Sequence, residues 1–190
     1  TLGTNDTGSN NTALGMQSLG SNTSGDGNTA VGYRALKANT TASNNTAVGY
    51  QTMVANTTGT NNTAVGRLAL DANTIADSNT AVGNAALTAN TTGAGNTAMG
   101  DGSLRANTTG ASNTAVGEDA GTAVTTGTRN TFIGALAGDA TDDGAENVAV
   151  GYGALSANCG DHNVAIGQDA LNVCTGAGNS AVGRAAGLAL

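Results

Sequence analysis

Apolar and polar residues follow one pattern that begins again at every seventeenth position along this chain. A pentapeptide of the form Asn-Thr-Ala-Val-Gly, as in residues 28–32, returns eleven times, and only its last two intervals are shorter, each by one position. Counted from the leading Asn as position 1, the consensus unit reads N-T-A-V-G-x-x-A-L-x-A-N-T-T-G-x-x. A short internal repeat of this kind indicates a fold built from stacked, equivalent units.

The length of the unit selects among repeat architectures. Helical repeats run past about 30 residues, whereas a unit of about half that length suits one coil of a β-solenoid. Thr-Ala-Val predicts a strand at positions 2–4, and the abundant Gly, Thr and Asn disfavour helix. Glycines at positions 5 and 15 are expected at corners with positive φ. We therefore predict an all-β fold, a parallel β-solenoid of about 11 coils, as a single domain over residues 1–190 that starts and ends in mid-unit.

Position 4 is apolar in every unit, and we expect its column to point inward as the main core ladder. A second apolar column, mostly Leu, follows at position 9. Each coil then carries about two sizeable apolar side chains, which is a thin core, so neighbouring chains are expected to supply further burial. The predicted core ladder consists of Leu14, Val31, Val48, Val65, Val82, Met99, Val116, Ile133, Val150, Ile166 and Val182.

The Asn at position 1 is predicted to form a polar column. Stacked coils place identical residues about 4.7–4.8 Å apart, so that amide side chains can hydrogen-bond along a rod about 50 Å long. Thr columns at positions 2, 13 and 14 flank it. The predicted Asn ladder consists of Asn11, Asn28, Asn45, Asn62, Asn79, Asn96, Asn113, Asn130, Asn147, Asn163 and Asn179.

The pattern is irregular between residues 118 and 146. Position 9 becomes Gly121 and then Gly138, and Phe132 replaces the Ala of position 3, where we expect it to point outward. Specific recognition of a partner is expected where the repeat fails. The candidate contact patch therefore comprises Phe132, Asp139, Asp142, Asp143 and Glu146.

Residues 147–151 and 163–167, Asn-Val-Ala-Val-Gly and Asn-Val-Ala-Ile-Gly, resemble the N-S-V-A-I-G repeat of trimeric autotransporter adhesin heads of the YadA type, without its Ser. The longer pattern in residues 28–41 is similar to repeat arrays of phage tail-fibre and bacterial surface-fibre proteins. The resemblance covers essentially the whole chain, although the period is longer than that of adhesin heads. It implies a left-handed parallel β-roll, commonly trimeric, with an extracellular structural or adhesive role.

Composition and charge narrow the functional classes. The 190 residues include one Phe, three Tyr, no Trp and no Pro, but 30 Gly, and only 10% are charged. An ordinary core of large side chains is thus excluded, while the strict period argues against disorder. A net charge of −7 with six scattered Lys and Arg offers no footprint for nucleic acid, and no stretch approaches the about 18 apolar residues of a membrane span. We expect neither nucleic-acid binding nor membrane insertion.

Little in the chain indicates catalysis. A single His, His162, cannot complete a nucleophilic triad, and the carboxylates lack the aromatic cleft of a glycosidase, so we expect no enzyme and no cofactor. The acidic residues 139–146 could bind Ca²⁺, but a solvated acidic corner is the preferred interpretation because no known calcium-loop pattern is present. Tyr33, Tyr50 and Tyr152, all at position 6, are interpreted as packing or contact residues.

Two features bear on the compartment of the protein. Cys159 and Cys174 lie at the same corner of consecutive coils, one step out of register, within reach of the geometry that a disulfide requires. We predict a Cys159–Cys174 disulfide, which would imply an oxidising, extracellular setting, with two free thiols as the alternative. Four Asn-Thr-Thr corners match the N-glycosylation acceptor pattern, at Asn39, Asn56, Asn90 and Asn107.

Three functional classes remain. The favoured one is a structural subunit of an extracellular fibre at a cell or virion surface, which self-associates as a head-to-tail filament or a homotrimer, since unblocked strand edges pair with further chains. Leu2, Leu188 and Leu190 are candidate end contacts. The alternative is an adhesin or tail-fibre head that binds a surface glycan or host receptor. Ice binding is the third class, and it usually needs a Thr-x-Thr strand, whereas the paired Thr here are adjacent.

Overall fold

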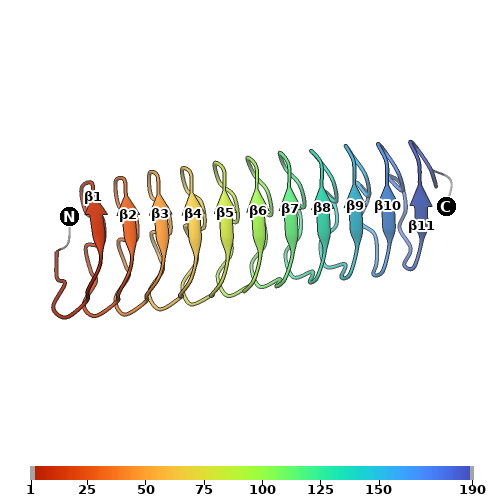
Figure 1. The fold of residues 1–190 in the computed structure, drawn as a ribbon. Coiled ribbons are helices and arrows are strands. Elements are labelled where there is room, and N and C mark those ends of the chain that lie inside the picture. Colours follow the sequence, from red (N-terminus) through yellow and green to blue (C-terminus); the bar gives the residue numbers. More distant parts are fainter. Residues whose placement is uncertain (1–2, 189–190) are drawn as a thin grey trace.

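A computed structural model describes residues 3–188, which form one rod of stacked coils (Figure 1). These residues contain eleven strands of three residues each and no helix, hence none long and apolar enough to cross a membrane. The strands are β1 (Thr12–Leu14), β2 (Thr29–Val31), β3 (Thr46–Val48), β4 (Thr63–Val65), β5 (Thr80–Val82), β6 (Thr97–Met99), β7 (Thr114–Val116), β8 (Thr131–Ile133), β9 (Val148–Val150), β10 (Val164–Ile166) and β11 (Ser180–Val182).

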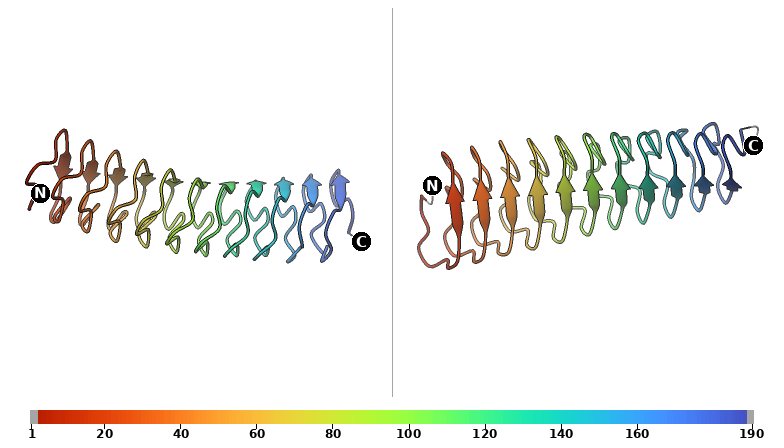
Figure 2. Two further views of the ribbon diagram at one scale, coloured as in Figure 1. Left: turned by 90° about the horizontal axis from the view of Figure 1, so that it is seen from below. Right: turned by 45° about the horizontal axis from the view of Figure 1, so that its top comes forward.

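All eleven strands belong to one parallel sheet in the order of the sequence, which confirms the predicted parallel β-solenoid. The register pairs equivalent positions: Thr12 lies beside Thr29 and Ala13 beside Ala30. The loops are hydrogen-bonded from coil to coil as well, for example from the N–H of Leu19 to the carbonyl of Ala35 at 3.0 Å. Figure 2 shows the strands in a single row along one side of the rod and the loops behind them.

The strands present position 3 to the interior, and not positions 2 and 4. Alternate residues of a strand point to opposite faces, and the small Ala at position 3, such as Ala30, is fully buried. The prediction of an inward position 4 was therefore wrong, and the whole column, Leu14, Val31, Val48, Val65, Val82, Met99, Val116, Ile133, Val150, Ile166 and Val182, is half-buried or exposed. Exposure reaches 67% at Leu14 and 73% at Val182.

The interior is filled instead by the position 9 column, which the turn after each strand brings inside. Leu36 is fully buried, yet it has a left-handed backbone with φ of 50°, and so does Leu87 with φ of 52°. A left-handed conformation costs an L-residue about 1–2 kcal/mol. Complete burial of a Leu side chain contributes about 1.5–3 kcal/mol, which offsets that strain.

Phe132 demonstrates how little room the interior has. It is fully buried, contrary to the expected outward orientation, and it lies against Gly121 of the coil before and Gly138 of its own coil. A Cβ added to Gly138 would come within 2.5 Å of the Phe132 ring, and one added to Gly121 within 2.8 Å. Position 3 and position 9 thus share one volume, which is filled by Ala with Leu or by Phe with two Gly.

The turn glycine at position 5 allows the coils to approach each other closely. Gly32 has φ of 133°, and a Cβ at this residue would lie 2.1 Å from the carbonyl oxygen of Gly49. A side chain is therefore excluded at this position. Position 15 differs from expectation: Gly25 lacks a positive φ, and Ala42 occupies the equivalent site.

The shared volume around Phe132 can be tested by a substitution cycle. Phe132→Ala should reduce the free energy of unfolding by about 3–5 kcal/mol because it leaves a cavity. Gly138→Leu alone should reduce it by about 1–3 kcal/mol or more through overpacking. The triple variant F132A/G121L/G138L restores the arrangement of the other coils, since Leu adopts positive φ at the same position there.

Chemical denaturation of the four proteins measures this cycle. We expect the triple variant to be more stable than F132A by at least about 2 kcal/mol, which is a coupling typical of residues in contact. Additive losses in the triple variant would show that the three residues do not share one volume.

Candidate functional site

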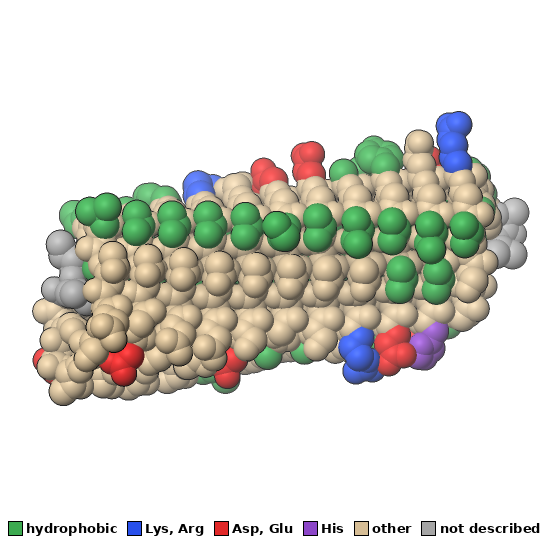
Figure 3. Space-filling model, viewed as in Figure 1, with side chains coloured by type: hydrophobic (Ala, Val, Ile, Leu, Met, Phe, Trp, Pro, Cys, Tyr) green, Lys and Arg blue, Asp and Glu red, His purple; other side chains and the backbone are tan. Residues whose placement is uncertain are grey.

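The outward side of the sheet is the most regular surface of the molecule. We call it the strand face: the side chains at positions 2 and 4 of β1–β11. Figure 3 shows its apolar position 4 row running the length of the rod, beside a parallel row that is polar except in two coils near the C-terminal end. That second row consists of Thr12, Thr29, Thr46, Thr63, Thr80, Thr97, Thr114, Thr131, Val148, Val164 and Ser180.

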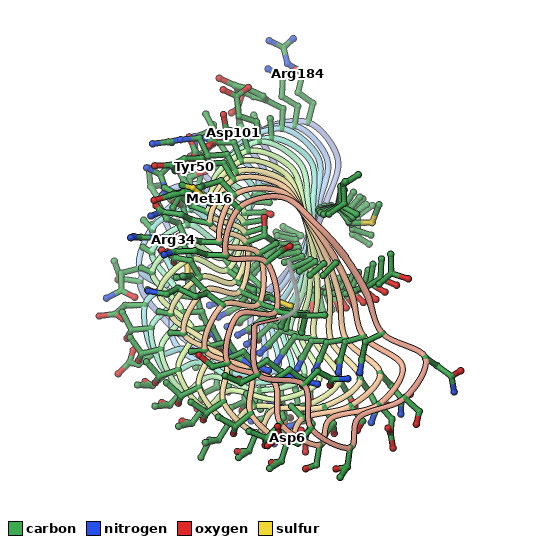
Figure 4. The ribbon with its side chains drawn as sticks, turned by 90° about the vertical axis from the view of Figure 1, so that its left-hand side faces the viewer. Asp6, Met16, Arg34, Tyr50, Asp101 and Arg184 are labelled. Atoms are coloured by element: carbon green, nitrogen blue, oxygen red, sulfur yellow. The ribbon has the colours of Figure 1, made fainter. Side chains whose placement is uncertain are left out.

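Charge is absent from the strand face although much of the face is exposed. The chain has six basic and thirteen acidic residues, and none of them falls within a strand of the described rod. Charged residues do occur at position 6, two residues after the end of the strand, as Arg67, Asp101, Glu118 and Arg184. Viewed end-on in Figure 4, Asp101 and Arg184 point away from the interior at one edge of the rod. Depletion of charge on an exposed apolar surface is characteristic of the core of a protein–protein interface.

The dimensions of the strand face fit such an interface. Eleven strands about 4.8 Å apart, with two outward residues each, give a strip about 50 Å long and about 10 Å wide, or about 500 Å². The apolar position 4 row makes up about half of this strip, and exposed apolar patches of a few hundred Å² on monomers are often functional. The area is of the same order as the about 800 Å² that each partner contributes to a stable interface.

Behind the sheet, the predicted Asn ladder of position 1 is present inside the rod. The N–H of Asn28 donates to Oδ1 of Asn11 at 2.9 Å, and this bond recurs from coil to coil as far as Asn179. The Asn28 Nδ2 group donates to the carbonyl of Ala42 in the following coil at 2.8 Å. Each Asn therefore connects neighbouring coils through its side chain.

A second Asn ladder, which the sequence interpretation missed, runs along position 12. Nδ2 of Asn39 donates to Oδ1 of Asn22 at 2.8 Å and to the same Ala42 carbonyl at 3.0 Å. The two ladders meet in this way at the carbonyls of Gly25, Ala42, Gly59, Ala76 and Gly110. The signal was available, since Asn recurs at position 12 in the units before residue 113. The ladder residues Asn22, Asn39, Asn56, Asn73, Asn90 and Asn107 are all fully buried.

Burial of the second ladder bears on the glycosylation pattern. The acceptor asparagines Asn39, Asn56, Asn90 and Asn107 lie inside the rod and are hydrogen-bonded. Their side-chain nitrogens are inaccessible in the folded protein. The Asn-Thr-Thr segments are structural corners and not surface acceptors.

The second ladder ends at Asn107, whose Oδ1 is buried and lacks a hydrogen-bond partner. The cause is Val124, which occupies the next ladder position and has no donor to offer. Cys159 and Cys174 are buried at the same corner further along and are free thiols, so the predicted disulfide was wrong. The Cys159 thiol donates to the carbonyl of Cys174 at 2.7 Å, while the Cys174 sulfur accepts from Nδ2 of Asn179 at 3.1 Å.

The environment of Cys159 disfavours its thiolate. Burial, together with the neighbouring Cys174, raises the pKa of the Cys159 thiol from 9.0 to about 12. A thiol that stays protonated is a poor nucleophile and a poor metal ligand. Cys159 therefore acts as a small buried side chain that fills the corner.

The candidate contact patch is not brought together. Phe132 is inside the rod, and Asp139 is half-buried, with its pKa raised by burial. Asp142 and Asp143 are exposed, and Asp142 accepts a hydrogen bond from Thr125. Among residues 3–188 no cluster of three or more acidic, His or Cys side chains could hold a metal ion.

Glu146 belongs to a separate charged group at one corner. It lies between Arg129, at 2.6 Å from Nη2 to Oε1, and His162, at 3.0 Å from Nδ1 to Oε2. The side chains of all three residues are exposed to solvent. Such surface pairs contribute at most about 1 kcal/mol each.

The remaining candidate residues are dispersed. Tyr33 and Tyr50 stack with ring centroids 5.3 Å apart, and Arg34 lies over the Tyr33 ring, whereas Tyr152 is exposed several coils away. Leu188 is 44% exposed, and the other proposed end contacts, Leu2 and Leu190, lie outside the described residues. No pocket is present within residues 3–188.

Comparisons with known proteins do not assign this chain to a family. No protein-family model, curated protein or solved structure matches this chain. The candidate site therefore depends on the geometry of the rod, and the strand face is its most extensive feature.

The importance of the buried amide ladders can be measured at Asn90. Its side chain donates to Gly93 and Asn73 and accepts from Asn107. Asn90→Ala should reduce the free energy of unfolding by about 2–4 kcal/mol, since it leaves buried polar groups unpaired. Conversely, Val124→Asn should increase it by about 1 kcal/mol by giving Asn107 a donor. Urea denaturation, with the exposed Thr92→Ala as an unchanged control, checks both.

The raised pKa of Cys159 predicts a loss of stability in alkali. Between pH 9 and pH 12 the thiol ionises in the unfolded chain but stays protonated in the fold, so the free energy of unfolding falls as pH rises. Cys159→Ala should show a smaller fall between neutral pH and about pH 11 than the wild-type protein. If the free energy of unfolding of the two proteins depended on pH in the same way, the raised pKa of Cys159 would be contradicted.

Proposed function

We propose that this chain is a non-enzymatic structural subunit of an extracellular fibre or filament, and that it associates with further copies of itself along the strand face. The observation that carries the proposal is the exposed apolar column at position 4, unbroken from β1 to β11 in a face without charge. Burial of this column against another copy would also add to the thin interior core.

The period of the strand face favours a second copy as its occupant. Side chains repeat along the face at the spacing of strands in a β-sheet, about 4.8 Å. A globular partner could match this spacing at few points, whereas another rod of the same chain matches it in every coil. A homo-oligomer with rods side by side is therefore the simplest assembly, and a homotrimer is the form that the resemblance to adhesin heads suggests.

The resemblance to adhesin heads and tail fibres also supports a location at the surface of a cell or virion. The apolar strands β9 and β10 carry it most clearly, and both lie in the strand face. Left-handed coiling belongs to the same proposal.

The alternative, an adhesin or tail-fibre head, is favoured by a different surface. At position 6 the side chains differ from coil to coil and point away from the rod, as Met16 and Tyr50 do in Figure 4. A variable edge of this kind could bind a surface glycan or host receptor. Ice binding has less support, because each strand from β1 to β8 presents one Thr beside one apolar side chain and not two Thr.

Self-association can be tested by placing charge in the strand face. V82K/M99K puts two ammonium groups in the middle of the apolar column, where burial of an unpaired charge is strongly unfavourable. T92K/T109K adds the same charge at exposed corners of the same two coils and serves as the control. We expect the wild-type protein and T92K/T109K to form oligomers in sedimentation velocity. V82K/M99K should need a protein concentration at least about tenfold higher to form the same oligomers.

Electron microscopy of the same samples separates the assemblies. Discrete trimers or bundles of rods support association through the strand face, and filaments with rods arranged end to end would point to the ends instead. A wild-type protein that stays monomeric at all concentrations would contradict the proposal.

A further inference from the structure

Lateral association of repetitive rods raises the question of register, and this inference rests on the proposed function. Strands β2, β3, β4, β5 and β7 have the same sequence, Thr-Ala-Val. Sliding one rod past another by one coil therefore recreates almost every contact and loses the overlap of only one coil. Repetitive surfaces of this kind specify their pairing weakly.

The strand face has one feature that breaks its periodicity. Strands β9 and β10 carry aliphatic side chains at both outward positions, Val148 with Val150 and Val164 with Ile166. Every other strand has Thr or Ser at position 2. Figure 3 shows this group, which we call the apolar quartet, as the place where a second apolar row accompanies the first.

We infer that the apolar quartet determines the register and direction of association, so that neighbouring copies are parallel and each quartet contacts the quartet of the adjacent copy. Thr hydroxyls in a dry contact need partners, which Thr columns at the same height can provide for each other. An aliphatic side chain opposite such a hydroxyl leaves it unpaired.

A shifted or reversed arrangement creates these mismatches. A slip by one coil brings Val148 or Val164 to the height of Thr131 or Ser180. Full antiparallel overlap sets β9 and β10 against β3 and β2, where Thr46 and Thr29 stand at position 2. Only the parallel, in-register arrangement pairs aliphatic with aliphatic and Thr with Thr throughout. Specificity then arises from the penalty on the alternatives, as in other self-recognising surfaces.

Cross-linking between single-cysteine variants tests the arrangement in the full chain. I166C, V150C and V31C each place a thiol in the position 4 column, whereas the native Cys159 and Cys174 are buried and common to all samples. Equal mixtures of differently tagged variants are oxidised briefly, and the products are separated by mass. We expect 166–166 cross-links to exceed both 150–166, the mark of a one-coil slip, and 31–166, the mark of antiparallel rods, by at least about tenfold.

Variants of the quartet supply the control. V148T/V164T makes position 2 of β9 and β10 the same as in β1–β8, and it should reduce the preference to less than about twofold while the oligomer persists. Adding T29V/T46V to this variant creates an equivalent group of four aliphatic side chains in β2 and β3. The preference for in-register cross-links, now measured as 31–31 cross-links of the V31C variant, should then return. Oligomers of the wild-type protein with equal cross-linking in all three combinations would overturn this inference alone. A monomeric wild-type protein would overturn the proposed function as well.

Discussion

Every side chain in this rod lies about 4.8 Å from its counterpart in the next coil, and it must therefore be compatible with a copy of itself above and below. Asn satisfies this condition in the interior because its amide both donates and accepts, so a column of Asn can be hydrogen-bonded from end to end. A column of buried carboxylates or ammonium groups would repel itself. Charged residues are accordingly confined to the edges, where neighbours can alternate in sign, as Arg129 and Glu146 do.

The same condition explains how so few large residues maintain a fold. In most coils one Leu or Met fills the apolar half of the interior, and in the coils up to Asn107 the buried amides fill the other half. The interior volume is conserved locally, because the large Phe132 at position 3 is accompanied by Gly121 and Gly138 in place of Leu at position 9. Stability is therefore distributed along the rod, because each coil contributes its own part of the core and its contacts with its neighbours.

The period of the sequence was sufficient to predict the solenoid, the strands and the first Asn ladder, because these follow from spacing alone. It was insufficient to predict which side of a three-residue strand faces inward. Position 4 is apolar and position 3 is small, and the usual rule that apolar residues are buried selects the wrong face when the larger apolar side chains lie outside. The orientation of Phe132 could have been predicted, since it coincides with the loss of Leu in two successive coils. The absence of a disulfide between Cys159 and Cys174 could not have been predicted, because it depends on the direction in which each sulfur points within one corner.

The second Asn ladder has a consequence for how such a chain tolerates insertions and deletions. Duplication of a whole unit adds a coil in which every ladder residue again finds a partner, so the rod can lengthen without any change inside. Loss of a single residue would move one ladder Asn away from the next. The two shortened units begin at Asn147 and Asn163, beyond Asn107, where Val124, Thr141 and the cysteines have already replaced the amides of this corner. A change in unit length would thus disrupt the amide column of this corner, and the units of this chain vary in length only where that column has ended.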